Sequence, residues 1–112
     1  MHELSITRNI VAIVAEAAGG RPVSRVLLQI GALSGVVPDA IAFCFNIVAE
    51  SGGLKGAKLD IAVIEGRAGC RDCGAEFAIA AFPAPCRCGS RRLSVLAGEE
   101  LLVKSFELGD AE

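Results

Sequence analysis

The sequence lacks tryptophan and tyrosine and contains a single histidine among its 112 residues. Stacking surfaces for nucleic-acid bases are therefore limited to five phenylalanines. With one histidine, the chain offers no Ser/His/Asp set for nucleophilic catalysis, and it has no phosphate-binding glycine loop. These absences argue against an enzyme, and none is expected.

Long apolar runs are also missing. No stretch approaches the roughly 20 apolar residues that cross a bilayer, and the start lacks the basic and apolar regions of a secretory signal. We therefore expect a cytoplasmic protein without membrane insertion. Five cysteines are present, four of them between residues 70 and 88. In a reducing compartment, such a group is better explained by metal binding than by disulfides.

The net charge of −2 is unevenly distributed. Residues 67–92 hold five arginines against two acidic residues, a balance of +3, which leaves −5 for the rest of the chain. One interpretation is a zinc ribbon that binds nucleic acid. The other is that four thiolates and one Zn²⁺ would add −2 there, so that the arginines mainly offset the metal site. The second interpretation is favoured, and no nucleic acid is expected as a partner.

Two helices and three strands are predicted by the spacing of apolar residues. Residues 5–18 and 38–50 are expected to be helical, the first helix capped by Ser5 and ended by Gly19-Gly20. The strands are expected at residues 23–30, 58–64 and 101–108. Because both helices need a common surface for their apolar sides, we predict an α+β fold with two helices packed on a small three-stranded sheet.

The apolar sides of these elements are predicted by the same spacing. On the strand at residues 23–30, the buried side is expected to comprise Val26, Leu28 and Ile30. On the first helix the apolar side comprises Ile6, Ile10, Ile13, Val14 and Ala17. On the last strand, Leu102, Phe106 and Leu108 are expected on the face opposite Val103, because side chains alternate along a strand.

Residues 67–94 interrupt this plan with glycine, proline, arginine and cysteine, and they lack the apolar volume of a core element. We predict that they form an inserted, zinc-ribbon-like, zinc-binding domain. Residues 1–66 and 95–112 would then form the main α/β domain. An insert of this size needs a bound metal ion or a disulfide to stay folded, because its hydrophobic burial is too small to support it.

The first cysteine pair lies in Cys70-Arg71-Asp72-Cys73-Gly74. This pattern is typical of a loop in which two thiolates hold one tetrahedral ion, with the glycine permitting a tight turn. A site closed by four thiolates leaves no position for water or substrate, so it would be structural. The fifth cysteine, Cys44, lies between two phenylalanines of the second predicted helix and is expected to be a buried apolar residue.

The second pair, Cys86 and Cys88, has one intervening residue instead of two. In an extended chain these side chains point to opposite faces, so they share an ion only if Arg87 lies in a turn. The flanking Pro85 and Gly89 favour that turn. Two interpretations stay open: zinc held by all four cysteines, or a labile or redox-active site of three thiolates.

The histidine is residue 2, between Met1 and Glu3. A bulky second residue predicts that Met1 is retained. Its α-amine, the His2 amide and the His2 imidazole can then form fused chelate rings, and the Glu3 amide can complete a planar set. Planar nitrogen coordination favours Ni(II) or Cu(II) over Zn(II), with affinity falling as the donors are protonated at low pH. A solvated terminal residue is the alternative interpretation.

Taken together, these segments resemble the HypA/HybF family of hydrogenase nickel-incorporation proteins. The resemblance extends over essentially the whole chain. It is carried by the start, a glycine-containing segment, part of the second helix and the cysteines: Met1-His2-Glu3-Leu4-Ser5-Ile6, Ile30-Gly31-Ala32-Leu33-Ser34-Gly35, Ala42-Phe43-Cys44-Phe45, and Cys70, Cys73, Cys86 and Cys88.

The resemblance implies a nickel metallochaperone rather than an enzyme. It implies Ni(II) on Met1, His2 and Glu3, with His2 indispensable. It further implies structural Zn(II) on Cys70, Cys73, Cys86 and Cys88. The implied partners are a HypB-type GTPase and the large subunit of [NiFe] hydrogenase, with urease as a second client in some members. Whether the chain is a monomer or a homodimer is left open by the sequence.

Overall fold

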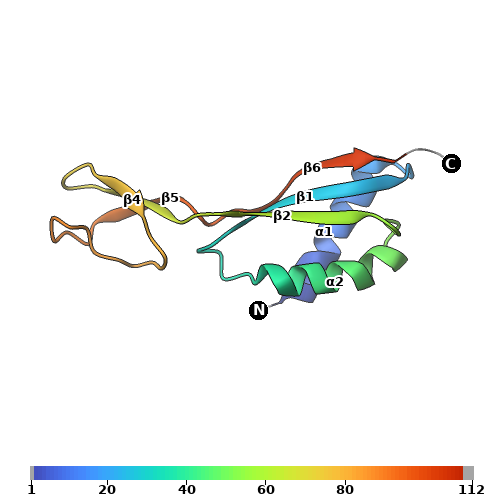
Figure 1. Ribbon diagram of the computed structural model, residues 1–112, viewed down its shortest axis with the longest axis horizontal. Helices are drawn as coiled ribbons and strands as arrows, with labels where there is room; N and C mark the ends of the chain where they lie inside the picture. Colours follow the sequence, from blue (N-terminus) through green and yellow to red (C-terminus); the bar gives the residue numbers. More distant parts are fainter. Residues whose placement is uncertain (1, 110–112) are drawn as a thin grey trace.

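Residues 2–109, the part of the chain that the computed structural model describes, form an elongated molecule with extents of 59 × 24 × 17 Å (Figure 1). The helices are α1 (Glu3–Ala18) and α2 (Pro38–Ser51). The strands are β1 (Val23–Gly31), β2 (Lys58–Ile64), β3 (Arg67–Cys70), β4 (Glu76–Ala78), β5 (Leu93–Ala97) and β6 (Leu101–Leu108). Within these residues, neither helix combines the length and apolar character that crossing a bilayer requires.

The first sheet has the strand order β2-β1-β6. Strand β1 runs parallel to β2 and antiparallel to β6, and α2 makes the connection between the two parallel strands. Both helices lie on one side of this sheet (Figure 1). The predicted α+β architecture of two helices on a three-stranded sheet is therefore confirmed.

The core lies between this sheet and the helices. Strand β1 contributes Val26, Leu28 and Ile30, which are fully buried, as the alternation along this strand predicts. From α2, Ile41 and Phe45 pack against them. Pro38 begins α2 at a position where its missing N–H costs nothing.

Helix α1 begins at Glu3, so the predicted cap at Ser5 is wrong. His2 occupies the cap position without a side-chain hydrogen bond. The buried face is also rotated from the predicted one: Thr7 is buried, whereas Ile13 is 58% exposed. Thr7 tolerates burial because its hydroxyl donates to the Glu3 carbonyl at 2.7 Å, which satisfies the polar group within the helix.

The faces predicted for β6 are wrong, and a β-bulge is the reason. Leu27 of β1 lies opposite Ser105, but the next residue, Leu28, lies opposite Val103, which leaves Lys104 as the extra residue. The bulge reverses the alternation, so Val103 and Phe106 both pack against the core. Leu102, predicted to share the face of Phe106, is exposed for this reason. Leu108 is exposed as well, and it lies beyond a second irregularity of the pairing, between Val23 and Arg25.

A second sheet, of order β4-β3-β5, forms the narrow end of the molecule. Its buried apolar cluster is small and consists of Ala68, Cys70, Ile79, Cys86 and Leu93. Strand β5 pairs with β3 as far as Ala97, so this sheet continues past residue 94. The division into two domains stays a prediction.

The two sheets meet where three glycines approach closely. The amide of Gly31 donates to the Glu100 carbonyl at 2.7 Å, and the amide of Leu33 donates to the Gly98 carbonyl at 2.7 Å. A Cβ atom added at Gly31 would overlap the Gly98 carbonyl, and one added at Gly98 would lie 2.6 Å from the Gly66 Cα atom. The junction therefore requires glycine for steric reasons.

We expect Gly31→Ala to lower the free energy of unfolding by about 1–3 kcal/mol, the usual cost of forcing atoms into a packed region. Urea denaturation followed by circular dichroism measures this. Gly109→Ala is the matched control, because its added Cβ would make an ordinary contact of 3.6 Å with Ser24. Equal stability of the two variants would contradict the steric account of the junction.

Candidate metal centres

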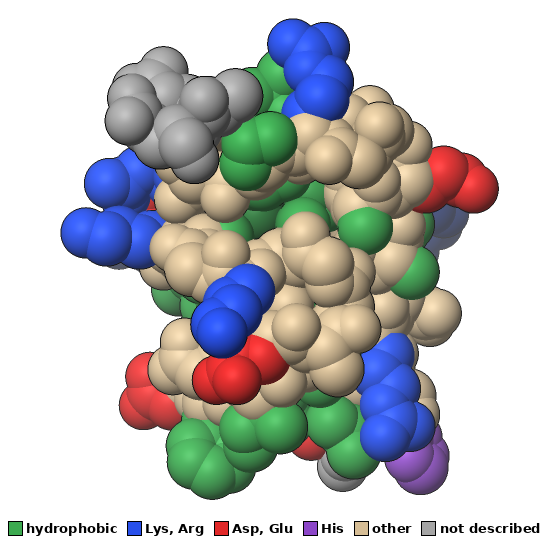
Figure 2. All heavy atoms as spheres, turned by 90° about the vertical axis from the view of Figure 1, so that its right-hand side faces the viewer, with side chains coloured by type: hydrophobic (Ala, Val, Ile, Leu, Met, Phe, Trp, Pro, Cys, Tyr) green, Lys and Arg blue, Asp and Glu red, His purple; other side chains and the backbone are tan. Residues whose placement is uncertain are grey.

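The predicted nickel ligands lie at the start of α1. Met1 lies outside the described residues. His2 is exposed, and its carbonyl accepts the first helical hydrogen bond, from Ile6 N–H at 3.0 Å. Its imidazole is the single purple side chain near the lower edge of Figure 2. Because His2 and Glu3 begin the helix, their own amides have no acceptor within it.

The Glu3 side chain reaches the start of α2. Its Oε2 atom accepts a hydrogen bond of 3.4 Å from the amide of Val37. Sequence reasoning missed this contact. The available signal was Pro38, since a residue that precedes proline is held extended, and Val37 has φ −90° and ψ 114°. The two helix starts are thereby held side by side (Figure 1).

The four predicted zinc ligands converge at the end of the molecule that the second sheet forms (Figure 1). Their sulfur atoms all lie within 4.8 Å of one another. The Sγ atoms of Cys70 and Cys88 are 3.7 Å apart, and those of Cys73 and Cys86 are 3.6 Å apart. A tetrahedron with Zn–S bonds of about 2.3 Å has S···S edges of roughly 3.8 Å. The donor set therefore fits a tetrathiolate zinc site. We name these residues the cysteine cluster.

The first loop of the cluster follows β3. Gly74 N–H donates to the Cys70 carbonyl at 2.9 Å, and Cys73 N–H lies 3.5 Å from the Cys70 sulfur. Gly74 has φ +80°, in the region that favours glycine. The predicted tight turn after the second cysteine is therefore present.

The second loop resolves the geometric problem of its short spacing. Arg87 and Cys88 lie in a turn closed by Gly89 N–H, which donates to the Cys86 carbonyl at 2.9 Å. The amide of Cys86 is in turn held by the Ser90 carbonyl at 2.8 Å. This turn satisfies the condition for Cys86 and Cys88 to face one ion, and it brings four sulfur atoms together rather than three.

The thiols of the cluster differ in acidity. The backbone N–H of Cys73 lowers the pKa of Cys70 to about 6, although burial opposes this. The Ser90 N–H lowers the pKa of Cys88, but the sulfur atoms of Cys86 and Cys70 raise it by more, to about 12. Four thiolates at these distances thus need a cation to offset their charge.

Asp72, within the first loop, is not directed at the cluster. Its carboxylate accepts a hydrogen bond from the Ser90 hydroxyl and lies 3.8 Å from the Arg92 guanidinium. Arg71 donates to the Ser94 hydroxyl at 2.9 Å. These contacts brace the loops around the cysteines.

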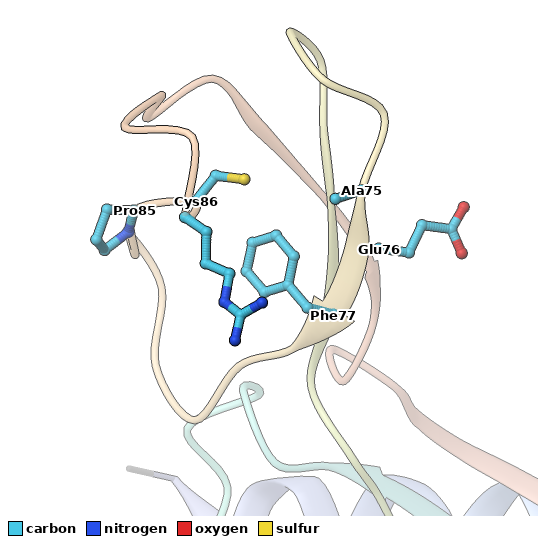
Figure 3. Close-up of a pocket in the computed structure, with 6 residues that line it drawn as sticks. Ala75, Glu76, Phe77, Pro85 and Cys86 are labelled. Carbon is cyan, nitrogen blue, oxygen red and sulfur yellow. The ribbon is translucent and has the colours of Figure 1, made fainter.

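A pocket of about 390 Å³ lies beside the second loop (Figure 3). It is lined by Ala75, Glu76, Phe77, Pro85, Cys86 and Arg87. In Figure 3 the Glu76 carboxylate points away from the Phe77 ring and from Cys86. The pocket therefore brings together no acid–base pair of the kind that catalysis requires.

Comparisons with known proteins agree on one family. A family model described as "Hydrogenase/urease nickel incorporation, metallochaperone, hypA" matches residues 1–108. The hydrogenase maturation factor HypA of Nostoc sp. is 53% identical over 108 residues, which cover 96% of each chain. The protein of the same name from Trichormus variabilis is 54% identical over 108 residues, with 96% of each chain covered.

Solved structures give the same result for the fold. The solution structure of the Ni metallochaperone HypA from Helicobacter pylori superposes with a TM-score of 0.68 and 28% sequence identity, covering 96% of this chain and 97% of that one. A second solution structure of a HypA protein gives a TM-score of 0.69 at 26% identity, covering 96% of both chains.

Proposed function

Because the chain belongs to the HypA family of hydrogenase/urease nickel-incorporation metallochaperones, we propose that it binds Ni(II) through Met1, His2 and Glu3. It then delivers the ion to the large subunit of a [NiFe] hydrogenase. Urease is the second client class, in keeping with the description of the family. The role is transport of the ion, and the nickel is cargo rather than a catalytic cofactor.

The observation that carries this proposal is the position at which α1 begins. The amides of His2 and Glu3 precede the first helical hydrogen bonds, so nickel can take them as donors without breaking the helix. With the Met1 amine and the His2 imidazole they form a planar nitrogen set, which suits Ni(II). The Glu3 carboxylate is held by Val37, and its negative charge favours the cation.

The exposure of His2 suits a carrier. A donor at the surface can be protonated or displaced by a competing ligand, which releases the ion to a client protein. A deeply buried site would hold nickel more firmly but would oppose its transfer. This balance favours delivery over storage.

The cysteine cluster is proposed to hold structural Zn(II) on Cys70, Cys73, Cys86 and Cys88. Sulfur separations of 3.6 and 3.7 Å support this, as does the absence of any further ligand directed at the cluster among the described residues. The ion would staple the two loops that flank the second sheet. Four cysteines used as metal ligands rather than as disulfides are typical of a reducing compartment, so we also propose a cytoplasmic location.

The proposed partners follow from this role. A HypB-type GTPase would act with the protein in loading the client, and the protein itself would be a monomer or a homodimer. Nucleic acid is not proposed, because Asp72 and Ser94 already engage two of the arginines around the cysteine cluster.

A transfer assay tests the function. Nickel-loaded protein is mixed with the nickel-free large subunit and a chelator that captures free nickel. We expect nickel to appear in the large subunit, because direct transfer avoids the solvent. In the control, the nickel-loaded chelator without the protein is mixed with the nickel-free large subunit, and the nickel content of the large subunit is measured. If all nickel reaches the chelator and none the large subunit, the proposed delivery is refuted.

A further inference from the structure

Helix α2 exposes large apolar side chains that the fold does not use. Phe43 is 69% exposed, Ile47 is 58% exposed, and Val37 at the cap position is 54% exposed. Phe45, two residues from Phe43, is only 1% exposed. The segment Ala42-Phe43-Cys44-Phe45 therefore places one phenylalanine in the core and the other in solvent. We name Val37, Phe43 and Ile47 the outer strip.

Phe43 and Ile47 form the helical part of the outer strip, and Val37 lies just before the first residue of α2. Residues four apart are neighbours on a helical surface, so Phe43 and Ile47 contact the same region of solvent. The core side is formed by Ile41, Phe45 and Ala49, and Phe43 lies on the opposite side of the helix. Figure 2 shows apolar side chains gathered along the lower edge of the molecule, where Figure 1 places α2, with the histidine at the same edge.

The charges of α2 have one sign. The helix carries Asp39 and Glu50 and contains no lysine or arginine between Pro38 and Ser51. Both acidic residues lie on the side of Phe43, since they precede and follow it by four and seven residues. A surface that is apolar in its centre and acidic at its margins complements a partner that is apolar in its centre and basic at its margins.

The outer strip also adjoins the nickel terminus. The amide of Val37 donates to the Glu3 carboxylate, so one end of the strip contacts a proposed nickel ligand. A partner seated on α2 would therefore lie beside His2. Proximity of this kind removes the need for nickel to pass through solvent.

We propose that the outer strip is the docking surface for an amphipathic helix of a partner protein, whose apolar side chains cover Phe43 and Ile47 and whose basic side chains pair with Asp39 and Glu50. This inference rests on the proposed nickel carriage, because it identifies where the exchanging partner sits. Phe43 and Ile47 are four residues apart on α2, so they offer the apolar side of such a helix one contiguous contact.

Two other occupants fit less well. A second copy of the chain related by a twofold axis would bring the acidic residues of both α2 helices together, and like charges repel. An anionic lipid surface would be repelled by Asp39 and Glu50 for the same reason.

The test uses the full-length protein and a labelled amphipathic helical peptide of leucine and lysine, with a leucine and glutamate peptide for comparison. Fluorescence anisotropy measures the dissociation constant of each. We expect only the lysine peptide to bind, and we expect Phe43→Ser and Ile47→Ser each to weaken it about tenfold, as truncation of an interface anchor does. Serine has nearly the helix propensity of phenylalanine and isoleucine, so both variants should stay folded.

Ile13→Ser is the matched control, since Ile13 is exposed to 58%, the same fraction as Ile47, but lies on α1. It should bind the lysine peptide like the unmodified protein. An equal loss for Ile13→Ser, or tighter binding of the glutamate peptide, overturns the proposal. Two further results would overturn it: self-association of the protein in sedimentation that is abolished by Phe43→Ser, or binding to anionic phosphatidylserine vesicles that is abolished by Phe43→Ser. Phe43→Ser should leave the nickel affinity unchanged. Nickel titration of the unmodified protein tests nickel carriage independently of the peptide, so a failure of docking can be distinguished from a failure of nickel carriage.

Discussion

The His2→Ala variant is expected to lose high-affinity nickel binding, with a dissociation constant raised by more than about 100-fold. The imidazole is one of the donors, and its loss also opens the chelate ring that holds the His2 amide. Substitution of a residue that only orients a metal ligand already lowers metal affinity about 10–100-fold, so removal of the ligand itself should lower it further. Isothermal titration calorimetry with Ni(II) measures the change.

Two further measurements make this prediction specific. Zinc content should be unchanged in His2→Ala, because the cysteine cluster lies at the end of the molecule formed by the second sheet, whereas α1 begins near mid-length, beside the start of α2 (Figure 1). A Gly-Ser extension placed before Met1 should reduce nickel affinity as His2→Ala does, since it converts the proposed amine donor into an amide. Retention of nickel binding by His2→Ala would refute the assigned site, and retention by the extended protein would remove the α-amine from it.

Loss of zinc is expected to disorder the second sheet and leave the first sheet folded. The buried cluster of the second sheet contains five residues, and two of them, Cys70 and Cys86, are proposed ligands. Little apolar burial remains without the ion. Structural zinc contributes about 10–16 kcal/mol in zinc-finger peptides, far more than the few buried apolar side chains of the second sheet can supply. We expect Cys88→Ser or strong chelation to collapse the amide signals of β3, β4 and β5 in ¹⁵N correlation spectra.

The first sheet supplies the internal reference. Its core includes Val26, Leu28 and Phe45, which are buried without any metal ligand, so signals of β1 and α2 should keep their dispersion. Cys44→Ser is the matched control, because Cys44 is half-buried on α2 and lies away from the cluster. Full zinc content and an ordered second sheet in Cys88→Ser would support the three-thiolate interpretation instead.

Much of the fold was predictable because it depends on local spacing. The alternation of Val26, Leu28 and Ile30 predicted β1 and its buried face, and Pro38 marked the start of α2. Strand β6 shows where local spacing fails. The extra residue Lys104 is visible only in the pairing with β1, so alternation assigned Leu102 to the wrong face.

The candidate sites divide in the same way. The types of ligand follow from the residues themselves: a histidine beside the first residue, and thiolates in two pairs. The closure of the second pair depends on a turn through Arg87 whose hydrogen bonds come from Gly89 and Ser90. Spacing alone therefore allowed three or four thiolates, and the converged sulfur positions favour four.

The amino-acid sequence by itself determined both helices, the three strands of the first sheet, the family resemblance and the types of ligand offered at the two candidate metal sites, because these follow from side-chain type and short-range spacing. Only the tertiary structure decided that four sulfur atoms meet, that Glu3 contacts Val37, and that Phe43 faces solvent while Phe45 is buried. The reason is physical: burial and convergence depend on which surfaces pack together, and residues distant in the chain supply those surfaces.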